Sequence, residues 1–481
     1  MEIDLRPVVP ALIVAVTGVV VLLAQAFTPR GRPGPSLPLA LLGLGGAMAS
    51  VVVLCLRGAR GASLGGAYVL DDFSLFLHGL ILAVVTGAVL ISPSYLRATG
   101  AERGEYYALL LFSAVGMLGL VSCLELVALF VALEIMSVAL YAAAGLHRDR
   151  PESTEAAMKY FLTGAFSSAF FLYGVALLYG VSGSTWIDRI ALSVAAASGE
   201  QATMAVLGAG LLLVGFGFKV ASVPFHMWAP DVYQGAPTTV TALMAAGVKA
   251  AAFGGFLRVF LRALPGLGDE WQPAVAALAL VTMVVGNLGA LAQTNLKRML
   301  AYSSVAHAGY LLCAFAASSG MGIAAVLFYL VAYAFVNLGG FGALAALARD
   351  GREPLSLDDL AGLARRRPAL AAALAVFMIS LTGVPVSAGF VGKFYLFRAA
   401  VDAGYVSLAI VGFLMSVVSA YYYLRVVVAM YMRDPVREDT WARISPASAV
   451  ALSFSVVVIL GLGVYPGPVL DWARLAAQSL L

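Results

Sequence analysis

Charged residues and cysteines are scarce in this sequence. Only 11% of its 481 residues are charged and 62% are hydrophobic, a composition that leaves a water-soluble domain no way to bury its apolar surface. The three cysteines, Cys55, Cys123 and Cys313, lie far apart with no CxxC or other ligand spacing. This pattern predicts neither a disulfide framework nor an iron–sulfur site, so any electron carrier would belong to a partner.

Long apolar stretches take the place of the missing charges. An apolar run of about 20 residues spans the hydrocarbon as a helix, and unbroken runs of this length are not the alternating strands of a barrel. The sequence therefore predicts an all-α integral membrane bundle of about 14 helices. The predicted spans are 7–27, 37–56, 72–92, 106–121, 123–145, 155–180, 202–222, 237–263, 272–293, 298–317, 321–348, 368–401, 404–432 and 446–466.

The basic residues of the loops predict an orientation, because loops rich in Lys and Arg stay cytoplasmic. With 14 spans and the N-terminus outside, the inner loops hold Arg30, Arg32, Arg97, Arg103, Arg148, Arg150, Lys297, Arg298, Arg349, Arg352, Arg365, Arg366, Arg367, Arg433, Arg437 and Arg443. The outer side holds the smaller set of Arg6, Arg57, Arg60, Arg189, Arg258, Arg262 and Arg474. Both termini are therefore predicted outside, and the net charge of +4 reflects this loop bias and not nucleic-acid binding.

The first span is interpreted as a membrane helix and not as a cleaved signal peptide. Its last residues resemble a cleavage site, but Glu2, Asp4 and Arg6 precede it in place of the basic segment of a signal peptide.

Lysine is rarer than arginine and is placed differently. The chain has only five lysines among its 29 basic residues, and Lys219, Lys249 and Lys393 fall well inside apolar spans, where a cation is costly and usually functional. Desolvation can remove the proton of a lysine but not that of an arginine. A membrane core that holds lysine and excludes arginine indicates groups that titrate, with a static ion pair as the alternative role for each lysine.

The other two lysines and two acids each have two interpretations. Lys159, about one turn into its helix, either snorkels to the interface or takes part in function. Lys297, beside Arg298, fits the loop charge bias better than a relay role. Glu134 lies mid-span, where a carboxylate needs either a proton or a cation. Glu125, nine residues earlier, is expected to be a helix-end charge, and the alternative is a second relay member.

Proline interrupts two predicted spans. The seventh runs from Gly215 through Lys219 to Pro224, and the twelfth contains both Pro385 and Lys393. Proline inside a helix frees backbone carbonyls, which at membrane depth is tolerated only beside protein or a wet cavity. Interrupted helices that carry an ionisable group are typical of the ion path of a transporter.

The two interrupted spans are five apart, and this odd offset makes them run in opposite directions. The spacing predicts two inverted five-helix repeats, helices 4–8 and 9–13. The predicted segments are 1–105 with the first three helices, 106–263 with the first repeat, 264–432 with the second repeat, and 433–481 with the last helix and a tail.

Histidine and tyrosine provide further polar groups in the spans. His226 and His307 are candidates to relay protons because histidine titrates near neutral pH, and a hydrogen-bonded structural histidine is the alternative for both. His78 and His147 are expected at the membrane interface. Tyr421, Tyr422 and Tyr423 are expected to have packing roles only. Arg425 is expected to snorkel or to pair locally.

Three stretches of the chain carry a recognisable pattern. Gly217–Thr238 reads GFKVASVPFHMWAPDVYQGAPT, Leu296–Ser304 reads LKRMLAYSS, and Gly389–Phe394 reads GFVGKF. They resemble the antiporter-like membrane subunits of respiratory complex I, the proton-pumping NADH:quinone oxidoreductase. The VPFHxWxPD core is similar in related cation/proton antiporter and membrane hydrogenase subunits, whereas VYQGAPT resembles the N-type subunits specifically. The resemblance covers nearly the whole chain.

Two features separate the chain from other members of that family. Lys393 stands where the M-type subunits carry an acid, and the chain stops soon after the fourteenth span, without the long lateral helix of the L-type subunits. The resemblance implies a proton path through each half, joined by a polar axis along the membrane midplane. It implies Glu134 and Lys219 as a coupled ion pair, Lys249 as the central relay and Lys393 as the ionisable group of the second half. Further relay candidates are Lys159, His226, Lys297 and His307.

The resemblance also implies the setting of the chain. NADH, flavin, iron–sulfur clusters and quinone are expected in partner subunits, with no cofactor or metal in this chain itself. The expected partners are M-, K- and J-like membrane subunits, the lipid bilayer and protons, with no nucleic acid. The expected location is a bacterial plasma membrane, crossed many times.

Two other functions fit the same pattern. One is a subunit of a multisubunit sodium/proton antiporter, which shares the core motif but is coupled to no redox reaction. The other is a passive scaffold whose buried charges only fix helix packing. Copurification with a flavin- and iron–sulfur-containing arm would exclude the first alternative, and loss of proton transport in variants would exclude the second.

Overall fold

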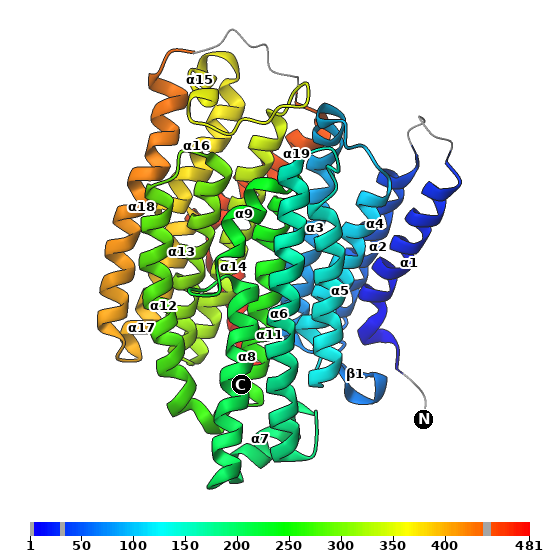
Figure 1. Cartoon of the computed structure of the whole chain (residues 1–481), viewed down its shortest axis with the longest axis vertical. Helices are drawn as coiled ribbons and strands as arrows, with labels where there is room; N and C mark the ends of the chain where they lie inside the picture. Colours follow the sequence, from blue (N-terminus) through cyan, green and yellow to red (C-terminus); the bar gives the residue numbers. More distant parts are fainter. Residues whose placement is uncertain (1–3, 29–33, 436–443) are drawn as a thin grey trace.

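The described part of the chain is a bundle of nearly parallel helices with one small β-hairpin (Figure 1). The computed structural model describes residues 4–28, 34–435 and 444–481. Within these ranges, 13 helices are long and apolar enough to cross a membrane. Backbone groups in hydrocarbon must be satisfied within the chain, so helices are the structure that this composition requires.

The membrane-length helices are α1 (Val9–Ala26), α2 (Ser36–Leu56), α3 (Asp72–Thr99), α4 (Glu105–Ser122), α5 (Leu126–Ala144), α6 (Pro151–Ser182), α8 (Glu200–Val220), α12 (Gly268–Leu291), α13 (Leu296–Ala316), α14 (Gly320–Ala346), α18 (Val406–Met432), α19 (Pro446–Val464) and the continuous run of α10 (Thr238–Leu243), the π-helical turn η3 (Met244–Val248) and α11 (Lys249–Arg262). The shorter elements are η1 (Arg6–Val8), β1 (Gly61–Ser63), η2 (Leu64–Gly66), β2 (Tyr68–Leu70), α7 (Ile187–Ala196), α9 (Trp228–Gly235), η4 (Pro265–Leu267), η5 (Asp358–Leu360), α15 (Leu363–Arg366), α16 (Pro368–Thr382), α17 (Ala388–Asp402) and α20 (Gly467–Gln478). Strands β1 and β2 pair antiparallel, with Gly61 opposite Leu70.

The predicted spans agree with the membrane-length helices to within a few residues at most ends. One of the two spans in which the sequence predicts an interruption is divided into separate helices. The predicted span 368–401 is two helices, α16 and α17, separated at Gly383. Gly383 has a φ of 89°, the left-handed conformation that ends helices and that glycine adopts without strain. The 13 membrane-length helices and the α16–α17 pair together correspond to the 14 predicted spans.

The two ends of the bundle carry different elements. The start of α1 and the C-terminus lie towards the end that carries α7, and α15 lies at the opposite end (Figure 1). An even number of crossings places both ends of a chain on the same side of a bundle. The arrangement of the termini therefore fits 14 crossings.

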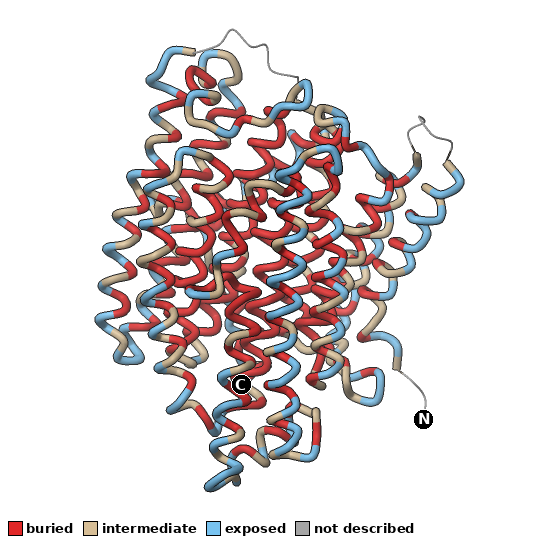
Figure 2. Tube along the Cα trace, viewed as in Figure 1, coloured by how far each residue is buried: buried red, intermediate tan, exposed pale blue. Residues whose placement is uncertain are grey.

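The core of the bundle is formed by three neighbouring helical segments. In their most apolar stretches, all residues of the α10–η3–α11 run are buried, as are 94% in α13 and 89% in α14. The corresponding share is 33% in α1, α2, α6, α18 and α19, so these helices form the periphery (Figure 2). A charged side chain on the central segments is therefore shielded from lipid and from bulk water.

Three residues expected at surfaces or interfaces are buried. Arg258, expected on the outer side, is fully buried and donates two hydrogen bonds to Asp71, at 2.8 and 2.9 Å. His78 is also fully buried, with Nε2 2.9 Å from the Ser122 hydroxyl. His147 lies buried after α5 and stacks on the ring of Tyr95. Each of the three residues has a polar or ring partner inside the protein, although His78 Nδ1 and His147 Nε2 have no hydrogen-bond partner within the described residues. Arg30, Arg32, Arg437 and Arg443 lie outside the described residues.

Candidate functional site

Lys249 lies on the fully buried run at the centre of the bundle. It begins α11 directly after the π-helical turn η3, an irregularity that is frequent at functional sites. Its Nζ donates hydrogen bonds to the carbonyl oxygen and the hydroxyl of Ser304 on α13, at 2.5 and 2.6 Å. The ammonium also lies 5.3 Å from the centre of the Tyr333 ring on α14. Lys249 thus connects the three central segments.

Lys219 lies in the last turn of α8, and the left-handed residue Ala221 ends that helix. Its Nζ donates to the hydroxyls of Ser137, at 2.7 Å, and Tyr141, at 3.3 Å. Both hydroxyls belong to α5, about one and two turns beyond Glu134. The expected direct contact between Glu134 and Lys219 is not among the ion pairs of the described residues, in which lysine pairs occur only at Lys159 and Lys297.

Glu134 faces a cavity at the edge of the bundle. The Ser168 hydroxyl on α6 donates a hydrogen bond of 2.5 Å to its Oε1. The cavity has a volume of about 480 Å³ and is otherwise lined by Leu109, Phe112, Phe130, Val131, Ile135, Val138, Ala139 and Ala142. Val131 and Val138 are about half exposed, so this wall belongs to the outer surface of α5. Glu134 therefore lies on the helix that holds Lys219 and lines a cavity towards the periphery of the protein.

Lys393 lies beside the interruption between α16 and α17. Its Nζ donates to the carbonyl oxygens of Leu381 and Thr382, at 2.8 and 3.1 Å, and to the Ser416 hydroxyl, at 2.7 Å. These carbonyls are the last of α16, where the helix has no further amide to satisfy them and the helix dipole favours a cation. The ammonium also lies 5.0 Å from the centre of the Tyr310 ring. The interruption thus supplies the acceptors for the buried lysine.

His307 stands between Lys249 and Lys393. Its ring centre lies 5.3 Å from that of Tyr333 and 5.2 Å from that of Tyr310. These are the two rings that the ammonium groups of Lys249 and Lys393 approach. The structure therefore brings three of the candidates into one continuous cluster on α11, α13 and α17, with tyrosine rings between them.

Hydroxyl groups complete the surroundings of His307. Its Nδ1 lies 2.5 Å from the Tyr329 hydroxyl, and its Nε2 lies 3.0 Å from the Tyr423 hydroxyl. The Tyr423 hydroxyl is also hydrogen-bonded to Ser303, next in sequence to the Ser304 that holds Lys249. The polar groups thus form a chain from Ser303 through Tyr423 and His307 to Tyr329.

The expectation that three neighbouring tyrosines only pack is wrong for two of them. Tyr423 belongs to the chain around His307, and the Tyr422 hydroxyl donates to Asn287 at 3.0 Å. Tyr421 is mostly exposed on the surface of α18. Arg425 donates to the carbonyl oxygen of Gln293, 132 residues away just after the end of α12, so its partner is not a local one. Tyrosine in an apolar helix does not reveal from sequence whether its hydroxyl has a partner.

Lys159 and His226 lie outside the central cluster. Lys159 forms ion pairs with Glu155 and Asp231, each at 2.6 Å, and its side chain is 42% exposed. Asp231 also pairs with Arg298 at 2.5 Å, so these charges join α6, α9 and α13. His226 lies between α8 and α9, and its buried Nδ1 has no hydrogen-bond partner within the described residues.

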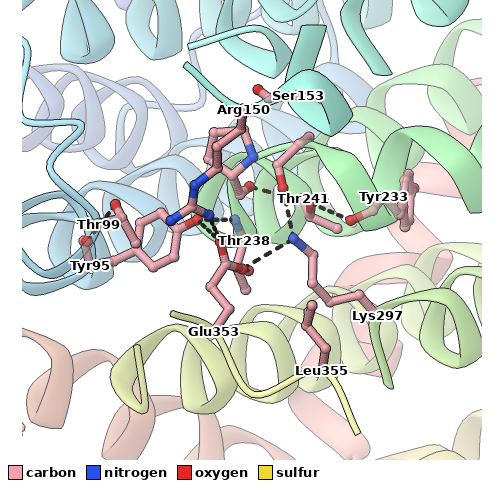
Figure 3. A network of polar contacts seen from close by, with 12 residues as sticks. Tyr95, Thr99, Arg150, Ser153, Tyr233, Thr238, Thr241, Lys297, Glu353 and Leu355 are labelled. Carbon is pink, nitrogen blue, oxygen red and sulfur yellow. Dashed lines mark hydrogen bonds and ion pairs between the residues drawn. The ribbon is translucent and has the colours of Figure 1, made fainter. Parts of the chain in front are cut away.

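Lys297 is not a loop residue, as the charge bias suggested, but a buried one in the first turn of α13. Only 2% of its side chain is exposed, and its Nζ donates to the Ala236 carbonyl at 2.7 Å and to Glu353 at 3.2 Å (Figure 3). Glu353 follows α14 and is 8% exposed. Burial by itself raises the pKa of the Glu353 carboxyl, but Lys297 and the hydrogen bonds from Thr238 and Tyr95 outweigh burial and hold that pKa at about 2.

Glu353 was missed from the sequence, and no signal there could have found it. Acids in loops are ordinarily solvated, and its burial depends on segments that are distant along the chain. Glu125, in contrast, behaves as a helix-end charge. It is the N-cap of α5, and its carboxylate accepts from the backbone amides of Val127 and Ala128, at 3.1 and 2.6 Å.

Metal ligation has no visible basis in the described ranges of the chain. They contain no group of three or more His, Cys, Asp or Glu side chains placed to hold a metal ion. Cys55, Cys123 and Cys313 are free, and the last two are buried. The ionisable groups of the cluster around His307 are two lysines and one histidine, whose chemistry is the gain and loss of protons.

Comparison with known proteins identifies similar sequences over the whole length of the chain. A family model described as NADH:quinone oxidoreductase/Mrp antiporter, TM, matches residues 123–419. NADH-quinone oxidoreductase subunit N of Trichlorobacter lovleyi is 44% identical over 478 residues, which cover 99% of this chain and 98% of that protein. The subunit of the same name from Chloroflexus aggregans is 43% identical and covers 97% of this chain, with 96% of its own length matched.

Solved structures with the same fold come from two kinds of complex. A chain of respiratory complex I from Thermus thermophilus with bound aureothin superposes with a TM-score of 0.82 and 39% identity, covering 96% of this chain and 98% of that one. A chain of the Mrp complex from a Dietzia species gives a TM-score of 0.87 at 24% identity, covering 99% and 98% of the two chains. The second likeness is one of fold alone.

Proposed function

Because the chain belongs to the family of membrane subunits shared by NADH:quinone oxidoreductase and Mrp antiporters, we propose that it is a proton-translocating membrane subunit of respiratory complex I. Relatives named as N subunits of NADH-quinone oxidoreductase, at 40–47% identity, support this assignment. The observation that carries the mechanism is the set of buried lysines, each held by uncharged groups, on interrupted or irregular helices. Intramembrane cations so placed are characteristic of proton relays.

Each member of the relay has a separate role in the proposal. Glu134 and Lys219 form the relay of the first half, communicating through the α5 hydroxyls that hold Lys219. Lys249 is the central carrier, and Lys393 is the ionisable group of the second half. His307 joins these two lysines, because its ring stands against both tyrosines that the ammonium groups approach.

Three further residues are secondary members of the proposed path. His226, at the interruption after α8, offers a buried nitrogen without a hydrogen-bond partner in the described residues. Lys159 and Lys297 are held by carboxylates. A lysine that loses its proton beside a carboxylate leaves that anion unpaired, so these two exchange protons less readily than the central lysines.

The energy for transport has to come from outside this chain. Moving one charge against roughly 200 mV requires about 4–5 kcal/mol, equivalent to about a thousandfold change in the proton affinity of a relay group. Making and breaking a contact between Glu134 and Lys219 in a desolvated site is a source of that size. In the proposal, NADH, flavin, iron–sulfur clusters and quinone are held by partner subunits, and this chain carries no redox chemistry itself.

The proposal includes the setting of the subunit. It lies in a bacterial plasma membrane with both termini on the outer side, next to M-, K- and J-like membrane subunits. The segments 106–263 and 264–432 are inverted halves, each with its own path. The interruptions beside Lys219 and Lys393 support this division, since they occur in the fourth span of each half.

The composition of the native complex tests the assignment against the antiporter alternative. The tagged chain, purified from its own membranes in mild detergent, is expected to carry flavin and iron–sulfur clusters in its partners, detected by absorbance and by electron paramagnetic resonance. A complex that contains only other antiporter subunits and no redox centre would place the chain in the sodium/proton antiporter branch of the family.

Proton transport tests the assignment against a passive scaffold. In inside-out vesicles that contain the assembled complex, Lys219→Ala, Lys249→Ala and Lys393→Ala are each expected to lower NADH-driven acidification by about tenfold or more. Native gels control for assembly. Normal acidification in all three assembled variants would show that the buried lysines only fix helix packing.

A further inference from the structure

Glu353 is a buried acid that the proposed relay does not use. It lies between α14 and η5, and both of its carboxylate oxygens are occupied (Figure 3). Oε1 accepts from the Tyr95 hydroxyl at 2.6 Å and from the Arg150 guanidinium at 3.1 Å. Oε2 accepts from the Thr238 hydroxyl and from Lys297 at 3.2 Å. Four donors on four separate segments therefore meet at one carboxylate.

These donors come from different parts of the chain. Tyr95 is on α3, Arg150 is the N-cap of α6, Thr238 begins α10, and Lys297 lies in the first turn of α13. The predicted inverted halves meet here, since two of the donors belong to 106–263 and Lys297 belongs to 264–432. Further hydrogen bonds close the junction, from the Thr238 amide to the Tyr95 hydroxyl at 3.1 Å and from Lys297 to the Ala236 carbonyl at 2.7 Å.

Two of the helices whose first turns bond to Glu353 extend to the Lys249 site. Thr238 begins the run that carries Lys249, eleven residues or about 16 Å further along. Lys297 lies seven residues, or about 10 Å, before Ser304 on α13. The Lys249–Ser304 contact therefore depends on the relative position of these two helical runs, and the Glu353 carboxylate bonds the first turn of each.

The chemistry of the junction is that of a fixed anion and not of a proton carrier. Two cations and two hydroxyls donate to the carboxylate, and each of them favours its charged form. The pKa of about 2 agrees with this arrangement. A group that stays ionised can set the position of its neighbours without gaining or losing a proton at neutral pH.

We infer that Glu353 is a positioning residue that fixes the Lys249–Ser304 contact by bonding the starts of α10 and α13 together across the junction of the two halves. This inference rests on the proposed function, because it assigns Glu353 a role in the same relay. In this role Glu353 carries no proton itself, and the segment between α14 and α15 becomes part of the transport machinery.

The test compares Glu353→Gln with a matched control in the same segment, Asp350→Asn. Asp350 is 80% exposed and forms an ion pair with its neighbour Arg349, so the control removes one charge without touching the junction. Asp350 has a φ of 48°, a conformation that asparagine also tolerates. In inside-out vesicles with equal amounts of assembled complex, we expect NADH-driven acidification to fall about fivefold in Glu353→Gln and to stay near normal in Asp350→Asn.

A double-mutant cycle with Ser304→Ala separates positioning from a general structural role. Ser304→Ala removes the hydroxyl of the Lys249–Ser304 contact and leaves the carbonyl bond. If Glu353 acts through this contact, the two losses are therefore not independent, and the fall in acidification caused by Glu353→Gln is smaller in the Ser304→Ala background than in the wild type. An equal fivefold loss in both backgrounds, or normal acidification in Glu353→Gln, overturns the inference. Thr238→Val, which removes one neutral donor and preserves shape, replaces Glu353→Gln in the same cycle if the charge variant does not assemble.

Lys249→Ala, assayed in the same vesicles, distinguishes failure of the positioning role from failure of the proposed relay. If Lys249→Ala fails to pump while Glu353→Gln pumps normally, only the positioning role is wrong. If Lys249→Ala pumps normally, the proposed relay itself is wrong, whatever the result for Glu353. Electron transfer from NADH to a water-soluble acceptor is measured for every variant and shows that the redox arm is intact.

Discussion

Each of the central lysines, Lys219, Lys249 and Lys393, has an ammonium held by uncharged oxygen atoms. Hydroxyls hold Lys219, a hydroxyl and a carbonyl hold Lys249, and two carbonyls and a hydroxyl hold Lys393. Such acceptors stabilise the cation, but none of them is left as an unpaired charge when the proton departs. This arrangement permits titration, whereas the carboxylate beside Lys297 opposes it.

Replacement of Lys249 by arginine tests titration at the residue scale. Arginine keeps the positive charge but does not release its proton, since its pKa stays above about 12. We therefore expect Lys249→Arg to impair NADH-driven proton pumping nearly as severely as Lys249→Ala, with the assembled complex present on a native gel. If Lys249 were only a static cation, arginine at this position would preserve pumping better than alanine. An arginine variant that pumps at close to the normal rate while the alanine variant fails would establish the static role.

The acid stability of the protein tests the charge of Glu353. Its pKa of about 2 lies below its ordinary value of 4.5, so its contribution to folding is complete above about pH 4.5 and disappears as the pH falls towards 2. The full difference amounts to about 3 kcal/mol. We expect the thermal midpoint of the wild-type complex in detergent to exceed that of Glu353→Gln most at neutral pH, with the gap narrowing below about pH 4.5. A gap independent of pH would contradict an ionised Glu353.

The sequence indicated which residues are chemically unusual, but not which groups hold them. A lysine inside an apolar span is conspicuous in any sequence, and Lys219, Lys249 and Lys393 were found in that way. Their acceptors are serines, tyrosines and backbone carbonyls, which are common in membrane helices and carry no signal of their own. Glu353 shows the same limit, because its burial results from four segments that only the folded chain brings together.

At the scale of elements, helix length was easier to predict than helix contacts. Apolar runs and prolines defined the spans and the interruption in 368–401, since both are properties of local sequence. The amphipathic helices α7 and α20 were missed, because each is too short for a span and its apolar residues recur on one face only. Helix α20 is fixed by tertiary contacts, including Trp472 against Phe76 with ring centres 4.9 Å apart.

The close approach of α4 and α5 leads to a prediction about Gly116. A Cβ atom at Gly116 would collide with the backbone of α5 at Ala132 and Met136, on either side of Glu134. Overpacking of this kind costs about 1–3 kcal/mol, because two helix backbones have to separate. We expect Gly116→Ala to lower the thermal midpoint of the purified complex and to reduce proton pumping, since α5 carries both Glu134 and the hydroxyls that hold Lys219.

Gly210→Ala is the matched control for that helix contact. Gly210 lies in α8, and a Cβ atom there would meet no atom within 4 Å. Alanine has a higher helix propensity than glycine, so this variant should be as stable as the wild type or slightly more stable. Equal midpoints for Gly116→Ala and Gly210→Ala would mean that α5 can move away from α4 at no cost.

At the scale of the whole molecule, the orientation of the bundle in the membrane determines which compartment the Glu353 junction faces. The start of α1 and the C-terminus lie at the end that carries α7, and α15 lies at the other (Figure 1). The loop charge bias predicts that the α15 end is cytoplasmic. The orientation therefore rests on the basic loops, and the labelling of single cysteines tests it.

Single-cysteine labelling measures the orientation directly. The background variant lacks Cys55, Cys123 and Cys313, the only native cysteines. New cysteines replace Glu102 and Asp434, which are exposed in connections at the α15 end, and Glu200, which is exposed at the α7 end. If the basic loops are cytoplasmic, a membrane-impermeant maleimide will label the first two only in inside-out vesicles and the third only in right-side-out vesicles. The reverse labelling pattern would show that the protein has the opposite orientation in the membrane. The direction in which each half takes up and releases protons would then be reversed as well.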